Sequence, residues 1–71
     1  MAKREKPLMR LESNRTFNFH GRKYTKGATI RAFHYSGDWL RIKMNGRKWE
    51  DYWTYWTVLN MKDNGYITEA A

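Results

Sequence analysis

Positively charged and aromatic side chains alternate through the middle of the chain, and together they could bind a polyanion that carries flat rings. Within residues 31–48 the two kinds recur at every second position of RAFHY and again of WLRIK. Cations hold phosphates and rings stack on bases, a combination typical of proteins that bind RNA or single strands. We expect the cations to contact phosphates and the rings to stack or pack. The candidate nucleic-acid-binding residues are Arg31, Phe33, Tyr35, Trp39, Arg41, Lys43, Arg47 and Lys48.

The charge is concentrated in one part of the chain. The net charge is +7, yet residues 15–48 carry nine lysines and arginines against Asp38 alone, whereas residues 49–71 carry one lysine against four carboxylates. Such segregation creates a directional field that attracts a polyanion. A basic N-terminal segment could reach additional phosphates through Lys3, Arg4 and Lys6.

Other chemistry is poorly represented. The chain has no cysteine, and its only histidines are His20 and His34, so we expect no metal site and no cofactor. His20 is placed in a turn and His34 on an apolar face as a core or edge residue. Glu50 and Asp51 are adjacent, so on a strand they point to opposite faces and cannot act as a carboxylate pair. We predict a protein that is not an enzyme.

Hairpins must position the candidate residues. A two-residue Asn45-Gly46 turn would place Lys43 opposite Lys48 and Trp39 opposite Tyr52. One face of this hairpin would then carry Trp39, Arg41, Lys43, Lys48, Glu50 and Tyr52. A three-residue loop at 36–38 would place Ile30, Ala32 and His34 beside Met44, Ile42 and Leu40, and would leave Arg31, Phe33 and Tyr35 beside Lys43, Arg41 and Trp39.

The predicted sheet therefore has one apolar face and one face that mixes cations with rings. The Lys43–Lys48 pair would be repulsive, which a bound anion would relieve. Two alternatives stay open: the cations could simply solvate the rim of a small barrel, or a basic ribbon could enter the DNA major groove.

Residues 49–62 fit two structures. Aromatic and aliphatic residues recur here at helical spacing, but Trp, Tyr, Thr and Val favour strands, and Asn64-Gly65 indicates another hairpin. We predict a long bent strand, with a helix at about 49–62 beside a three-stranded sheet as the alternative.

The length of 71 residues predicts one small domain. We expect a flexible basic arm over residues 1–14 and an all-β domain over residues 15–71, either a strongly bent antiparallel sheet or an SH3-like barrel of about five strands. A short edge strand at Leu8 to Leu11 is the alternative for the arm. No signal peptide or membrane span is evident, so we expect a cytoplasmic protein.

The stretch GATIRAFHYSGDWLRIKMNGRKWEDYW (residues 27–53) resembles the central hairpins of bacterial SH3-type barrels, in which alternating aliphatics and an Asn-Gly turn separate two tryptophans. That resemblance implies an SH3-like barrel and peptide or cell-wall binding. The hairpin DWLRIKMNGRKW is also similar to hairpins of integrase arm-binding domains and of small phage anti-defence proteins. The short, basic, Trp-rich chain looks like a phage or mobile-element protein, which would act in the host cytoplasm.

The residues thus predict a non-enzymatic module that binds DNA or RNA. The alternative is a small inhibitor or adaptor that docks the same surface on an acidic host protein, because Trp, Tyr and Arg also favour protein interfaces. A homodimer through the acidic C-terminal third is a further expectation.

Overall fold

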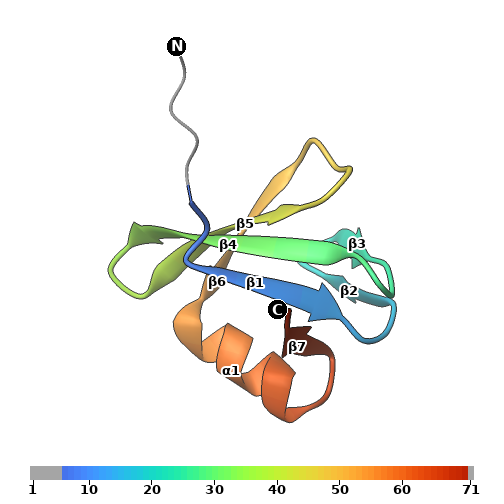
Figure 1. Ribbon diagram of the computed structural model, residues 1–71. Helices are drawn as coiled ribbons and strands as arrows, with labels where there is room; N and C mark the ends of the chain where they lie inside the picture. Colours follow the sequence, from blue (N-terminus) through green and yellow to red (C-terminus); the bar gives the residue numbers. More distant parts are fainter. Residues whose placement is uncertain (1–5, 71) are drawn as a thin grey trace.

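The computed structural model describes residues 6–70 and consists mainly of short antiparallel strands with one helix (Figure 1). In chain order the elements are β1 (Met9–Ser13), β2 (Phe17–Phe19), β3 (Arg22–Tyr24), β4 (Thr29–Ser36), β5 (Trp39–Met44), β6 (Glu50–Thr54), α1 (Tyr55–Asp63) and β7 (Ile67–Glu69). The predominantly β character is confirmed, but the helix shows that the fold is not all-β.

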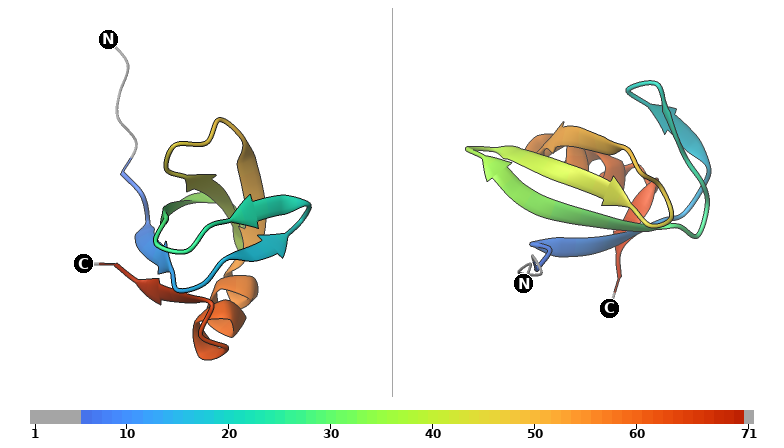
Figure 2. Two further views of the ribbon diagram at one scale, coloured as in Figure 1. Left: turned by 90° about the vertical axis from the view of Figure 1, so that its right-hand side faces the viewer. Right: turned by 90° about the horizontal axis from the view of Figure 1, so that it is seen from above.

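Five strands form one antiparallel sheet in the order β6-β5-β4-β1-β7, and β2 and β3 form a separate hairpin. Because β6 and β7 lie at opposite edges and do not pair, the sheet is open. Of the two predicted forms, the SH3-like barrel is therefore wrong, and an antiparallel sheet of about five strands is confirmed. Helix α1 lies under one face of the sheet, and the β2–β3 hairpin stands beside it (Figure 2).

The core lies between the sheet, α1 and the β2–β3 hairpin. The sheet supplies alternate residues that include Leu11, Ile30 and Ile42, all fully buried. The hairpin adds Tyr24, whose ring lies 5.4 Å from that of Trp53. Aromatic rings bury a large area in few residues, which suits a chain without disulfides.

Strand β1 lies inside the segment predicted to be a flexible arm. It pairs with β4 from Met9 to Glu12 and with β7 from Leu11 to Ser13, and Leu11 is fully buried. The arm prediction is therefore wrong for Met9–Ser13. Of the predicted arm contacts, Lys6 is exposed, whereas Lys3 and Arg4 lie outside the described residues.

The register of β4 and β5 agrees with the sequence prediction as far as His34. Arg31 lies opposite Lys43 and His34 opposite Leu40. Beyond this point a bulge places Ser36 rather than Tyr35 opposite Trp39, and the turn contains two residues, Gly37 and Asp38, instead of three. His34 has the predicted position on the same side of β4 as Ile30 and Ala32. It is exposed, as are all of residues 34–39, and is therefore not a core residue.

The predicted register of β5 and β6 is wrong by two residues. The Asn-Gly turn forms locally, since Arg47 N–H donates to the Met44 carbonyl at 3.1 Å, but strand pairing resumes only at Glu50, which lies opposite Lys43. The predicted register would have left Trp53 beyond the end of β5. The longer loop brings Trp53 opposite Leu40, where it is fully buried.

Residues 49–62 contain both predicted structures, since β6 is followed directly by α1. The strand ends at Thr54 and the helix begins at the next residue. The Thr54 side chain accepts a hydrogen bond from Thr57 N–H at 3.2 Å and caps the helix. Val58 and Met61, on one side of this helix, are buried. The strand prediction is wrong for residues 55–62, and the helix prediction is wrong for Glu50–Thr54.

Replacing Thr54 with alanine should lower the free energy of unfolding by about 1 kcal/mol, because the first turn of α1 loses its cap. Urea denaturation would measure this. Thr54→Ser retains a hydroxyl acceptor and should lose much less, so an equal loss for both variants would contradict the capping role.

Candidate nucleic-acid interface

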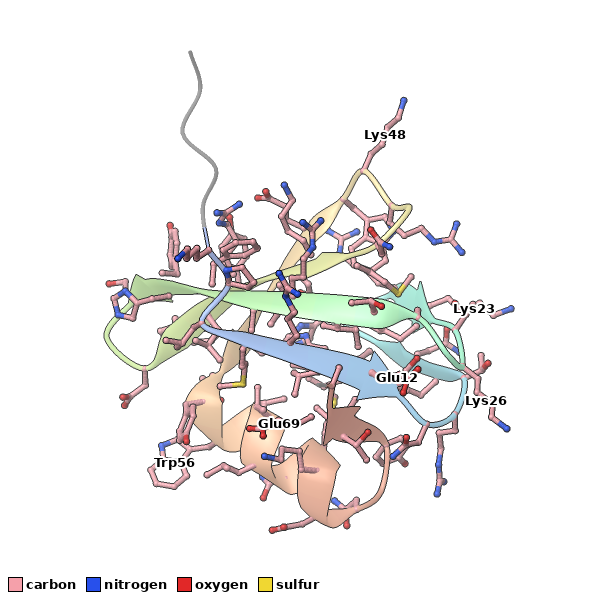
Figure 3. All side chains as sticks on the ribbon, in the orientation of Figure 1. Glu12, Lys23, Lys26, Lys48, Trp56 and Glu69 are labelled. Carbon is pink, nitrogen blue, oxygen red and sulfur yellow. The ribbon has the colours of Figure 1, made fainter. Side chains whose placement is uncertain are left out.

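The sheet face that points away from α1, called here the outer face, carries a row of cations. Directly paired positions on neighbouring strands place Arg10 opposite Arg31 and Arg31 opposite Lys43, and Glu50 ends the row on β6. We call Arg10, Arg31 and Lys43 the cation row. Figure 3 shows nitrogen-tipped side chains on this side of the sheet.

Arg31 occupies the centre of the cation row and carries an uncompensated charge. Its Nε atom is buried without a hydrogen-bond partner, and within residues 6–70 no carboxylate pairs with its guanidinium. Lys43 lies 3.8 Å from Glu50. Like charges at directly opposite positions destabilise a sheet, so Arg31 between two cations costs stability. The Lys43–Lys48 repulsion predicted from the sequence is absent, because Lys43 lies opposite Glu50. The like charges that do lie opposite one another are those of the cation row.

Phe33 is buried on the outer face rather than exposed for stacking. Its side chain is 5% exposed, and the Arg41 guanidinium carbon lies 4.8 Å from the ring centroid. Arg41 also donates from Nη1 to a Glu50 oxygen at 2.8 Å. The prediction of Phe33 as a stacking ring is therefore wrong, whereas packing, its alternative role, is observed. Arg41 presents a flat cation that is held in place.

Three exposed rings lie at the end of the outer face near the β4–β5 turn. Tyr35 is 59% exposed, Trp39 47% and Tyr52 39%, and the Tyr35 and Tyr52 ring centroids are 4.8 Å apart. Sequence reasoning missed Tyr52 as a contact although the expected alternation placed it on this face. It missed Arg10 because residues 1–14 were assigned to an arm.

Arg47 and Lys48 lie in the loop between β5 and β6, and both are exposed. Lys48 points away from the sheet on the outer-face side (Figure 3). The structure therefore brings Arg31, Arg41 and Lys43 together on one surface, with Tyr35 and Trp39 at one end. Arg47 and Lys48 extend the positive charge beyond the opposite end of β5.

A buried carboxylate network lies on the other face of β6. Asp51 accepts hydrogen bonds from Tyr24 Oη at 2.7 Å, from Trp53 Nε1 at 3.0 Å and from the Tyr52 N–H at 2.8 Å. His20 Nδ1 lies 3.0 Å from the same carboxylate. This network joins the β2–β3 hairpin to the sheet. The sequence predicted only that Glu50 and Asp51 would point to opposite faces of the strand, and it did not predict the partners of Asp51.

The network perturbs two pKa values. Burial alone would raise the pKa of Asp51, but the hydrogen bonds from Tyr24, His20 and the Tyr52 backbone outweigh it, and the pKa is lowered. Burial, followed by the adjacent Asp51 carboxylate, raises the pKa of Tyr24 strongly above its ordinary value. Both shifts stabilise an ionised Asp51 beside a neutral Tyr24.

We expect the free energy of unfolding to be constant around neutral pH and to decrease at acidic and at alkaline pH. Because the folded-state pKa of Asp51 is lowered, its contribution is present above about pH 4 and is lost as the pH falls through the folded-state value. Because that of Tyr24 is raised, its contribution is present below about pH 10 and is lost as the pH rises further. Urea denaturation across this range would test both. Tyr24→Phe should reduce the alkaline loss, whereas Tyr55→Phe at an exposed ring should not.

Comparisons with models of protein families, with curated proteins and with solved structures give no match to this chain. Among residues 6–70 no cluster of three or more His, Asp or Glu side chains is arranged to hold a metal ion. In the same range, no helix has the length and apolar character needed to cross a membrane.

Proposed function

We propose that this protein binds nucleic acid, without catalysis, through the outer face of its sheet. The cation row is the observation that carries the proposal. Arg10, Arg31 and Lys43 lie on neighbouring strands at directly opposite positions, where Cα atoms are about 4.5 to 5.5 Å apart. Folding places these like charges side by side, which lowers the stability of the sheet. Bound phosphates would neutralise the charges and remove the repulsion.

The other groups of the outer face support the same ligand. Arg47 and Lys48 add exposed charge at one end, and three exposed rings lie at the other. A surface that bound only an acidic protein would have less need of several rings beside a row of adjacent cations, although Trp, Tyr and Arg also suit protein interfaces. A host-protein inhibitor is therefore the second candidate function.

Salt-dependent binding tests the proposal. Fluorescence anisotropy would be measured with labelled DNA and RNA of about 16 nucleotides, single-stranded and duplex. Affinity should fall steeply between about 50 and 200 mM salt, because phosphate contacts release counterions. Arg31→Ala should reduce the slope of log affinity against log salt by about 0.7 to 0.9.

Lys62→Ala is the matched control. It also removes one positive charge, but Lys62 lies in α1, where it pairs with Glu69 at 3.5 Å, on the side of the sheet away from the outer face. It should leave the salt slope unchanged. Absence of binding, or an equal effect of both substitutions, would overturn the proposal and leave protein binding as the better interpretation of this surface.

A further inference from the structure

We propose that the ligand of the outer face is a single strand, whose backbone crosses the strands of the sheet along the cation row and whose bases lie toward Tyr35, Trp39 and Tyr52. This inference rests on the proposed nucleic-acid binding and names the form of nucleic acid that the same face accepts. Two features of the outer face support it: the exposure of the rings and the single line of cations on the same face.

If the ligand is a nucleic acid, the exposed rings can stack only on unpaired bases. Trp39 and Tyr35 are about half exposed although they are large and partly apolar, and the Tyr35–Tyr52 pair is held by its own ring contact at 4.8 Å. In a duplex the base faces are covered by neighbouring base pairs, whereas a single strand can place them on aromatic side chains. Rings in this position therefore favour a single strand.

The cation row is a single line of charges that crosses the sheet. Neighbouring strands are about 4.8 Å apart, so Arg10 and Lys43, two strands apart, span about 10 Å along this line. Glu50 ends the row on β6, and Glu12 follows Arg10 at the next outward position of β1. One such row matches the phosphates of one strand that crosses the sheet.

Arg41 lies between the cation row and the rings on the same face. Along β5 the outward positions are Lys43, Arg41 and Trp39, so the ring lies about 13 Å from the row, with Arg41 between them. Arg41 lies over Phe33, with its guanidinium carbon 4.8 Å from the ring centroid, and it pairs with Glu50. Guanidinium planes also stack on bases, so Arg41 would continue the stacking surface from the rings toward the backbone.

The test compares a single strand and its own duplex, using labelled oligonucleotides of about 16 nucleotides and anisotropy. We expect the single strand to bind at least about 10-fold more tightly at equal salt. Trp39→Leu and Tyr35→Leu should each weaken single-strand binding about 10-fold and leave the salt slope unchanged, because the slope counts phosphate contacts rather than stacked bases.

Trp56→Leu is the control for loss of an exposed ring. Trp56 is 64% exposed but lies on α1, away from the outer face (Figure 3). It should leave single-strand affinity unchanged. Circular dichroism of each variant would establish that the fold is retained.

The outcomes separate this inference from the proposed function. If Arg31→Ala reduces the salt slope but the duplex binds as tightly as the single strand, or the ring substitutions have no effect, nucleic-acid binding stands and the single-strand inference is wrong. If neither polymer binds, both are wrong. Single-strand preference that depends on Trp39 and Tyr35, but not on Trp56, supports it.

Discussion

Replacing Arg10, Arg31 and Lys43 together with threonine should weaken nucleic-acid binding by about 100-fold to 500-fold at about 0.1 M salt, while the fold remains at least as stable. Each phosphate contact contributes about 0.7 to 0.9 to the exponent of the salt dependence, and three contacts are lost together. Titrations of the triple variant over a range of salt, with urea denaturation alongside, would measure both quantities.

The triple substitution should lower the affinity for nucleic acid without lowering the stability of the fold. Arg31 lies directly opposite two cations, and a like-charge pair across strands costs about 0.2 to 1 kcal/mol. Threonine removes that repulsion and favours strands. A surface selected only for solubility would show no such conflict between stability and binding.

A matched triple variant controls for net charge. Lys23 on β3 and Lys26 in the β3–β4 turn lie outside the outer face (Figure 3). Lys62 lies on α1, on the other side of the sheet. Their replacement by threonine removes the same charge but should weaken binding far less. If both triple variants lost affinity equally, binding would depend on overall charge and not on the cation row.

The two faces of the sheet could be predicted from the sequence, whereas one strand register could not. Alternation of side chains placed Arg41, Lys43 and Tyr52 on one face, and the error of two residues in the β5–β6 pairing preserved that assignment because the period of a strand is two. The Asn-Gly signal indicated a real turn. It could not show that burial of Trp53 moves the resumption of pairing to Glu50.

The remaining errors have nonlocal causes. Strand β1 is short, and its partners are distant in the sequence: Glu12 lies opposite Thr29 and Thr68. Helix α1 contains residues that favour strands, but capping by Thr54 and burial of Val58 decide its structure. The cation row could not be predicted without β1, since Arg10 lies beside Arg31 only through the pairing of β1 with β4.

Asp51→Ala should cause the largest loss of stability of any single substitution considered, about 4 kcal/mol. The buried Tyr24 hydroxyl and Trp53 indole N–H would both lose their acceptor, and each buried unsatisfied donor costs about 1 to 3 kcal/mol. A chain of this length has a total stability of about 4 to 11 kcal/mol, so much of the protein would unfold. Urea denaturation followed by tryptophan fluorescence would measure the loss.

Glu50→Ala is the natural control because the two carboxylates are neighbours on opposite faces of β6. Glu50 is partly exposed and pairs with Arg41 and Lys43, so its removal should cost at most about 1 kcal/mol. Asp51→Asn keeps the shape of the side chain and one acceptor oxygen, and should fall between the two. Equal losses for Asp51→Ala and Glu50→Ala would contradict the network.

The same pair of substitutions separates folding from binding. Glu50 ends the cation row, so Glu50→Ala removes the carboxylate nearest Lys43 and should strengthen nucleic-acid binding slightly. Asp51 faces the core, and where Asp51→Asn remains folded its affinity should be unchanged. One strand thus holds a carboxylate that limits the charge of the outer face beside one that joins the β2–β3 hairpin to the sheet, and the two roles are separable by measurement.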